Sequence, residues 1–272
     1  MTEPRPRFAR GSIAAHPITH SGGNLVRYAG FKVLAVVSSL ALGAQLAVAQ
    51  ANPVADLLAA CKAEAGAPQD RLDACSKVIA DSKDDDIRAE ALVQRGVLRE
   101  GLEQREDAIA DYSEAIKIDA TNSVAFFNRG NVYDQLGQHD LAIADYSEAI
   151  KLDPNDADVY NNRGQAYDNG GQQDLAIADY TTAIRLAPAV ARPYYNRALA
   201  LFAKSDHKAS LADFDQAIKL DPTDSEAFAN RAVVHEAMGN QPAAKADYQK
   251  VLALQPAHNH AKEALARLMA SN

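Results

Sequence analysis

The sequence contains no tryptophan, only two cysteines and few runs of β-branched residues. Alanine and other strong helix formers are abundant, and tyrosine is the main aromatic residue. This composition favours helices over strands. We therefore predict an all-α fold. With two cysteines, one intramolecular disulfide is the most that the chain can form.

Basic residues are scarce outside the N-terminal region. The whole chain has 28 Lys and Arg against 36 Asp and Glu, a net charge of −8. Residues 1–49 hold five bases and one acid, so the remainder has 23 bases, 35 acids and a net charge of −12. Such a surface repels phosphate backbones, so we do not expect nucleic acid as a partner. The same charge is also consistent with solubility alone.

Motifs of common catalytic sites are absent from the sequence. It contains no G-x-S-x-G, no phosphate-binding loop and no H-E-x-x-H. His258 and His260 form a close histidine pair, but a weak metal site, because helix-borne ligands usually lie four residues apart. We therefore predict a protein that is not an enzyme and uses no cofactor or metal. An enzyme accessory or hydrolase is kept as an alternative hypothesis.

The N-terminal region predicts export. An apolar segment over residues 33–44 follows Arg27 and Lys32 and precedes an A-x-A sequence at residues 47–49, which is the arrangement of a secretory signal peptide. The segment is too short for a membrane span, which needs about 20 apolar residues. We expect cleavage after Ala49, a periplasmic location, and contact with the membrane only through the signal peptide. A retained signal anchor is the alternative.

The predicted signal peptide, residues 1–49, has an unusually long basic region before its apolar segment. A start at Val26 would give a signal peptide of ordinary length. We therefore suspect that residues 1–25 are an over-extended start.

Both cysteines lie in residues 54–84, which we predict to be a degenerate helical hairpin with its turn at Gly66-Ala67-Pro68. Antiparallel helices would bring Cys61 and Cys75 within reach of each other, and in an exported protein such a pair predicts a disulfide. As an alternative, residues 58–61 (LAAC) have the form of a lipoprotein cleavage box that would acylate Cys61. The preceding apolar run is interrupted by Pro53 and Asp56, which argues against that alternative.

The rest of the chain repeats with a period of 34 residues, which is typical of a solenoid of stacked units. The repeated positions include the prolines Pro154, Pro188, Pro222 and Pro256 and the aromatic residues Tyr112, Tyr146, Tyr180, Phe214 and Tyr248. Within one unit, Tyr160-x-x-Arg163-Gly164-x-x-Tyr167 is followed by Ala176-x-x-x-Tyr180 and Pro188. This spacing resembles that of the tetratricopeptide repeat (TPR) family over residues 89–258.

The resemblance implies a right-handed superhelical solenoid of antiparallel helix pairs. We place five repeats at residues 89–122, 123–156, 157–190, 191–224 and 225–258. Residues 259–270 predict one further helix, which would cap the exposed apolar face of the last pair.

An arginine and an aspartate recur in every repeat, 16 residues apart. The arginines are Arg95, Arg129, Arg163, Arg197 and Arg231, and the aspartates are Asp111, Asp145, Asp179, Asp213 and Asp247. A carboxylate fits the planar guanidinium in bidentate fashion, so we interpret these residues as ion pairs that tie the two helices of a repeat together. An anion-binding stripe is the alternative.

An amide ladder, preceded by Gln94, consists of Asn128, Asn162, Asn196 and Asn230. The family resemblance places this ladder on the concave surface, where in some TPR proteins an asparagine ladder holds an extended peptide. An amide both donates and accepts, so it can bind a peptide backbone without reading its sequence. A solvated asparagine of the repeat consensus is the alternative.

The same register adds further groove candidates and an acidic character. These candidates are Asn131, Asn161, Gln165, Asp134, Asp168 and Glu236. We therefore predict a non-catalytic interaction scaffold that binds a protein or peptide, as a basic or neutral extended segment in the concave groove. An architectural role in a cell-envelope assembly, through the convex face or the ends, is the alternative. The sequence does not predict the oligomeric state.

Overall fold

The computed structural model describes residues 53–270, so the predicted signal peptide lies outside the described residues. Every regular element within residues 53–270 is a helix, which confirms the all-α prediction. In chain order the helices are α1 (Pro53–Lys62), α2 (Pro68–Asp81), α3 (Asp85–Gly101), α4 (Arg105–Ile118), α5 (Ser123–Gln135), α6 (His139–Leu152), α7 (Ala157–Asn169), α8 (Gln173–Leu186), α9 (Ala191–Ala203), α10 (His207–Leu220), α11 (Ser225–Ala237), α12 (Gln241–Leu254) and α13 (Asn259–Ala270).

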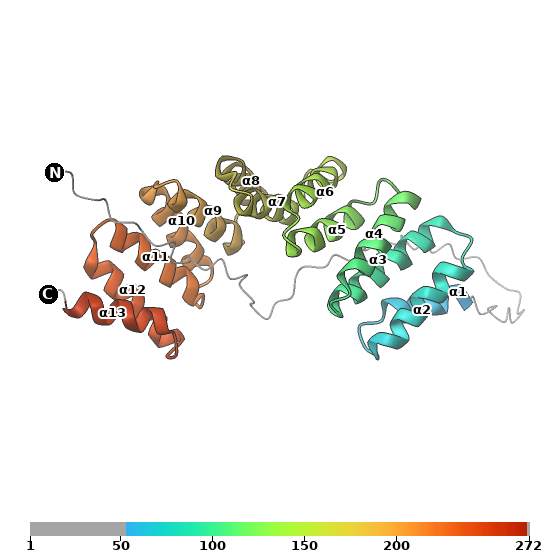
Figure 1. Ribbon diagram of the computed structural model, residues 1–272, viewed down its shortest axis with the longest axis horizontal. Helices are drawn as coiled ribbons and strands as arrows, with labels where there is room; N and C mark the ends of the chain where they lie inside the picture. Colours follow the sequence, from blue (N-terminus) through green and yellow to red (C-terminus); the bar gives the residue numbers. More distant parts are fainter. Residues whose placement is uncertain (1–52, 271–272) are drawn as a thin grey trace, which may run out of the picture.

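Consecutive helices pack as pairs, and the pairs stack side by side along an arch (Figure 1). The five central pairs run from α3–α4 to α11–α12, and each pair also contacts the next pair along the chain. Such a solenoid buries its apolar faces by stacking, because one helix pair alone cannot enclose a core.

The turns within the pairs depend on a left-handed backbone residue. Gly171, between α7 and α8, has φ of 78°, which glycine adopts without steric cost. Ser205 occupies the equivalent position between α9 and α10 with φ of 64°. The shape of the turn is therefore maintained even where the glycine is replaced.

The loops between the pairs position the start of the next helix. Asp156 caps α7 by accepting hydrogen bonds from the backbone N–H groups of Asp158 and Val159. Asp224 caps α11 in the same way. These side chains satisfy N–H groups that have no partner inside the helix.

Within each pair the two helices approach closely because small residues face the buried aromatic ring. A Cβ atom added to Gly164 would lie 2.8 Å from Cε1 of Tyr180, a ring that is almost fully buried. The fourth repeat has Ala198 and Phe214 at these two positions, and both are buried. The aromatic positions of the repeat therefore form the core.

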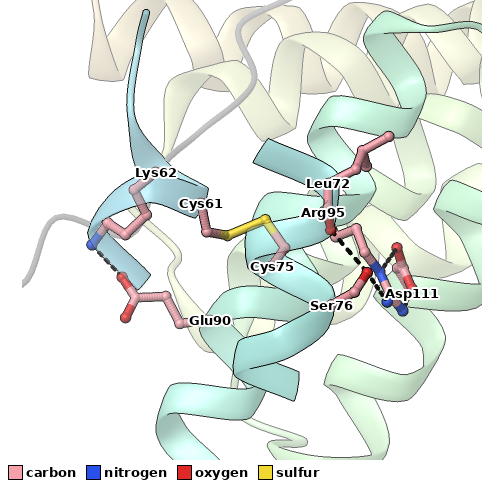
Figure 2. The surroundings of a disulfide bond; sticks show 8 residues. All are labelled: Cys61, Lys62, Leu72, Cys75, Ser76, Glu90, Arg95 and Asp111. Carbon is pink, nitrogen blue, oxygen red and sulfur yellow. Dashed lines mark hydrogen bonds and ion pairs between the residues drawn. A yellow bond between two sulfur atoms is a disulfide. The ribbon is translucent and has the colours of Figure 1, made fainter. Parts of the chain in front are cut away.

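Figure 2 shows how α1 and α2 are attached to the first repeat. Cys61 of α1 and Cys75 of α2 are joined in a disulfide, and both are fully buried. Helix α2 packs against α3, and Arg95 of α3 donates a hydrogen bond to Ser76 of α2. At the other end, Ala261, Ala264 and Leu268 of α13 are buried against the last pair.

Candidate binding groove

The helices form two sets along the arch. We call α3, α5, α7, α9 and α11 the inner helices and α4, α6, α8, α10 and α12 the outer helices. Each inner helix contacts the next inner helix as well as its own partner. Figure 1 places α6 and α8 on the outer side of the arch. The predicted amide and acid positions lie on the inner helices, and we call the surface that they share the groove face.

The recurring arginine clamps three helices together. Arg163 of α7 donates from Nε to Oδ2 of Asp179 (2.7 Å) and from Nη2 to Oδ1 of Asp179 (2.8 Å), both on α8. Its Nη1 donates to Oγ of Ser147 on the preceding outer helix, α6 (3.1 Å). Equivalent bidentate pairs are Arg95–Asp111, Arg129–Asp145, Arg197–Asp213 and Arg231–Asp247. The predicted ion pairs are therefore present, and the third contact links each repeat to its predecessor.

The surroundings of the clamp favour a structural role over an anion-binding stripe. Burial lowers the pKa of Arg163, but the hydrogen bonds and charge of Asp179 outweigh burial and leave that pKa raised. The guanidinium also lies beside the rings of Tyr160 and Tyr167, with its carbon 5.8 and 5.7 Å from their centroids. A guanidinium held by a carboxylate and two rings has little capacity left for a diffusing anion.

Several amides of the groove face form one hydrogen-bond network. Asn162 of α7 donates to Oδ1 of Asn131 on α5 (2.9 Å), which also accepts from the hydroxyl of Tyr146 (2.8 Å). Asn161 donates to Oδ1 of Asn162 (3.1 Å) and accepts from Nδ2 of Asn196 on α9 (3.0 Å). The network therefore holds three consecutive inner helices in register, and it fixes the orientation of each amide that it includes.

Two of the predicted groove residues are not accessible. Asn128 and Asn161 have 0% of their surface exposed, so the expectation that they line an open surface is wrong. Asn161 points toward α9, whose Asn196 it contacts, and Asn128 is enclosed without a hydrogen bond to either amide atom. Asn162, Asn196 and Asn230 are only half-buried.

The remaining candidates differ in their partners. Asn131 is nearly buried within the network, and Gln165 is half-buried. Asn230 donates to the hydroxyl of Tyr195 (2.8 Å), which continues the links between inner helices from α9 to α11. The sequence predictions did not include hydrogen bonds from the amides to tyrosine hydroxyls. The contact between Asn131 and Tyr146 could have been predicted from the sequence, because Asn131 precedes Tyr146 by 15 residues, close to the spacing of the Arg–Asp pairs.

The predicted acids also differ in the groups that contact their carboxylates. Asp134 lies 2.7 Å from Nδ1 of His139, and Glu236 accepts from the hydroxyl of Tyr248 and from Arg267. Burial raises the pKa of the Asp168 carboxyl, and no cation within residues 53–270 forms an ion pair with it. Among the three predicted acids, Asp168 is therefore the one whose carboxylate has neither a hydrogen-bond nor an ion-pair partner within residues 53–270.

Comparison with known proteins decides the family. The TPR repeat family matches residues 102–137 and 130–170, and the tetratricopeptide repeat families match residues 157–189, 191–224 and 214–246. These matches cover more than half of the chain. The chain belongs to the tetratricopeptide repeat family. No curated protein matches the chain.

Several solved structures share the fold of this TPR chain. YrrB is 23% identical, with a TM-score of 0.60, over 71% of this chain and 98% of its own. MamA from Desulfovibrio magneticus RS-1 is 19% identical, with a TM-score of 0.59, over 62% of this chain and 96% of its own. A TPR protein from Parabacteroides merdae is 15% identical, with a TM-score of 0.58, over 80% of this chain and 99% of its own. These similarities confirm the TPR solenoid.

Two further properties concern residues 53–270 only. No helix there combines the length and apolar character that crossing a bilayer requires. No group of three or more His, Cys, Asp or Glu side chains there is arranged to hold a metal ion. His258 instead accepts a hydrogen bond at Nδ1 from the backbone N–H of Ala261 (3.2 Å) at the start of α13.

Proposed function

We propose that this TPR protein is a non-catalytic scaffold that binds an extended protein segment of basic or neutral character along the groove face. TPR proteins generally mediate protein–protein interactions, and the family membership supports that part of the proposal. The solved structure of YrrB is described as that of a TPR protein with an unusual peptide-binding site. That description supports a peptide partner here by analogy of fold.

The proposal rests on two features of neighbouring inner helices. One is a row of amide side chains whose orientation is fixed by hydrogen bonds, and the other is an acid, Asp168, that has no ion-pair partner within residues 53–270. Asn196 donates one amide hydrogen to Asn161, and Asn230 donates one to the hydroxyl of Tyr195. Each amide has a second hydrogen and an oxygen that can accept, so it can pair with a peptide backbone. Because the internal hydrogen bonds already orient the amides, binding loses less conformational entropy than it would with free side chains.

Charge favours a basic over an acidic segment. The carboxylate of Asp168 lies on α7 in the middle of the row, and the raised pKa shows that burial already disfavours its charge. A cationic group nearby would offset that penalty, whereas an acidic segment would add to it.

A panel of peptides tests the proposal. Fluorescent peptides of equal length, each unable to form a helix, would carry Lys, Ser or Glu at alternate positions and be titrated with the protein. We expect the order Lys, Ser, Glu in affinity. Asp168→Asn should weaken the Lys peptide by about two- to fivefold, the range of a partly exposed ion pair.

The matched control is Asp140→Asn, an equivalent change of charge on the exposed first turn of the outer helix α6. It should leave the affinities unchanged. Equal effects of the two substitutions would show that net charge, and not the groove face, is responsible. Failure of every peptide to bind would contradict the proposal.

The second candidate is an architectural role through the convex face. Leu141 of α6 and Leu175 of α8 occupy equivalent positions of consecutive outer helices and are 50% and 48% exposed. Apolar side chains that recur at one position of adjacent repeats suit a protein interface. This candidate would be preferred if partner binding were lost in Leu141→Ser/Leu175→Ser and retained in Asp168→Asn.

We also propose that the protein is exported to the periplasm. The buried disulfide between Cys61 and Cys75 supports this location, because disulfides persist in oxidising compartments and are rare in the cytosol. Whether the pair is oxidised in cells is therefore a direct test of the location.

A further inference from the structure

A cavity of about 70 Å³ lies where α5, the end of α6 and the start of α7 meet. Val124, Phe127 and Val159 form its apolar wall, and Asp153 and Asp156 provide its carboxylates. Phe127 and Val159 are almost fully buried, whereas Asp153 is exposed and Val124 is half-buried. The cavity therefore has an apolar interior and an acidic side that reaches solvent.

We propose that this cavity binds a lysine side chain of the extended segment, an inference that rests on the proposed function. A lysine has an apolar stem that packs on aliphatic and aromatic walls and an ammonium group that requires carboxylate or water contacts. One water needs about 15 Å³, so the cavity admits roughly five water-sized groups, and a lysine side chain consists of about five such groups, from Cβ to Nζ. The planar guanidinium of arginine is wider and fits this volume less well.

The two carboxylates are held in place by backbone groups. Oδ1 of Asp156 accepts from the N–H groups of Asp158 (3.0 Å) and Val159 (3.4 Å) at the start of α7. Oδ1 of Asp153 accepts from the N–H of Asn155 (3.1 Å). Groups fixed before binding lose little freedom when a cation arrives, which favours selective recognition.

We call the place where an outer helix ends and the next inner helix begins a corner. The other corners of the repeats lack the acid pair, this apolar wall or both. The α8–α9 corner has Ala187 and Val190 in place of the two acids, and the α4–α5 corner has Asn122 in place of the second. The α10–α11 corner keeps both acids, as Asp221 and Asp224. The acid pair is therefore not a constant feature of the repeat.

The α10–α11 corner provides a matched control, because its acids have the same local roles but different neighbours. Asp224 caps α11, and Asp221 accepts from the N–H of Thr223. Tyr195 and Ala227 replace the Phe127 and Val159 of the proposed site, so the apolar wall is different. Substitution of either acid pair by Asn keeps the capping oxygens and removes two charges.

The first experiment measures lysine selectivity. Each peptide would carry one Lys, at a different position, and no other charged side chain. Its binding would be compared by fluorescence anisotropy with that of the same peptide carrying acetyl-lysine. For the wild type we expect the best Lys peptide to bind about tenfold more tightly than its acetylated form, between the effects of an exposed and a buried ion pair. Asp153→Asn/Asp156→Asn should remove this preference and leave acetylated-peptide affinity unchanged. Asp221→Asn/Asp224→Asn should retain the preference.

A preference that survives in Asp153→Asn/Asp156→Asn would overturn the inference, as would its equal loss in the α10–α11 control. Either result would leave groove binding itself intact, because the peptides would still bind. Failure of every peptide to bind would instead refute the proposed function.

The second experiment reports on the cavity without requiring groove binding. N-acetyl-lysine methylamide would be titrated into methyl-labelled protein while the methyl signals of Val124 and Val159 are followed by NMR. We expect saturable shifts of these signals in the wild type, absent from the Asp153→Asn/Asp156→Asn variant. Unmoved signals in the wild type, or the same shifts in both proteins, would refute the lysine site even if no peptide binds.

Discussion

Replacement of Arg163 by methionine should destabilise the protein through the aspartate that it leaves behind. Asp179 is nearly buried and receives two hydrogen bonds from Arg163, at 2.7 and 2.8 Å. Removal of one partner of a buried ion pair costs about 3–5 kcal/mol, because the other charge remains desolvated. The Arg163 side chain keeps 18% of its surface exposed, so we expect the lower end, about 3 kcal/mol.

The expected loss can be measured by urea unfolding followed by circular dichroism. With a slope of about 2 kcal/mol per molar urea, the midpoint should fall by about 1–2 M. Arg163→Met also removes the contact with Ser147 of the preceding repeat, so the transition should broaden as neighbouring repeats uncouple. The control is Arg192→Met, which breaks the exposed Arg192–Asp158 pair and should cost at most about 1 kcal/mol.

The double variant Arg163→Met/Asp179→Leu separates burial of an unpaired charge from loss of attraction. Replacement of a whole buried pair by apolar residues of similar volume is often nearly neutral. The double variant should therefore recover most of the stability that the single variant loses. Equal destabilisation of the single and double variants, or a loss in Arg163→Met no larger than in Arg192→Met, would refute this reasoning.

Two further predictions concern the first helix pair and the groove face. Replacement of Cys61 and Cys75 by serine should cost about 3 kcal/mol by the chain-entropy account for this loop length. Hydrogen exchange should place the loss in α1 and α2, and thiol labelling of the unreduced, unfolded wild-type protein should find neither cysteine reactive. Asp168→Asn should raise the melting temperature at neutral pH, because the folded pKa of Asp168 is raised and ionisation therefore destabilises the native state. This gain should disappear below pH 3.8, where the carboxyl is protonated in both folded and unfolded chains; a gain that persists there would contradict it.

The helix pairs of the repeats were predictable because their signals recur. Helices α5, α7, α9 and α11 begin at residues 123, 157, 191 and 225, the first residues of four predicted repeats. The first repeat differs, because Asp84 caps α3 and the helix begins at Asp85, four residues before the predicted start. The first repeat has Leu92 and Ala120 where the later repeats have an aromatic residue and a proline, so its start was predicted from the 34-residue register.

The amide ladder shows why the candidate site was less predictable. Asn128 and Asn162 share one position of the repeat, yet one is fully buried and the other half-buried. Periodicity assigns a residue to a helix face, but exposure depends on the side chains that neighbouring helices place against it. Those neighbours vary, since the residue before the ladder position is Phe127, Asn161 or Tyr195 in successive repeats.

The sequence by itself determined the solenoid, the helix pairs and the Arg–Asp clamps, because each depends on contacts between residues at constant separations along the chain. Only the tertiary structure decided which amides are accessible, which of the predicted acids has no side-chain partner within residues 53–270, and where the cavity between α5 and α7 lies. These properties depend on how unlike side chains from adjacent repeats fill the space between them. That space is set by packing across helices, which a 34-residue period does not specify.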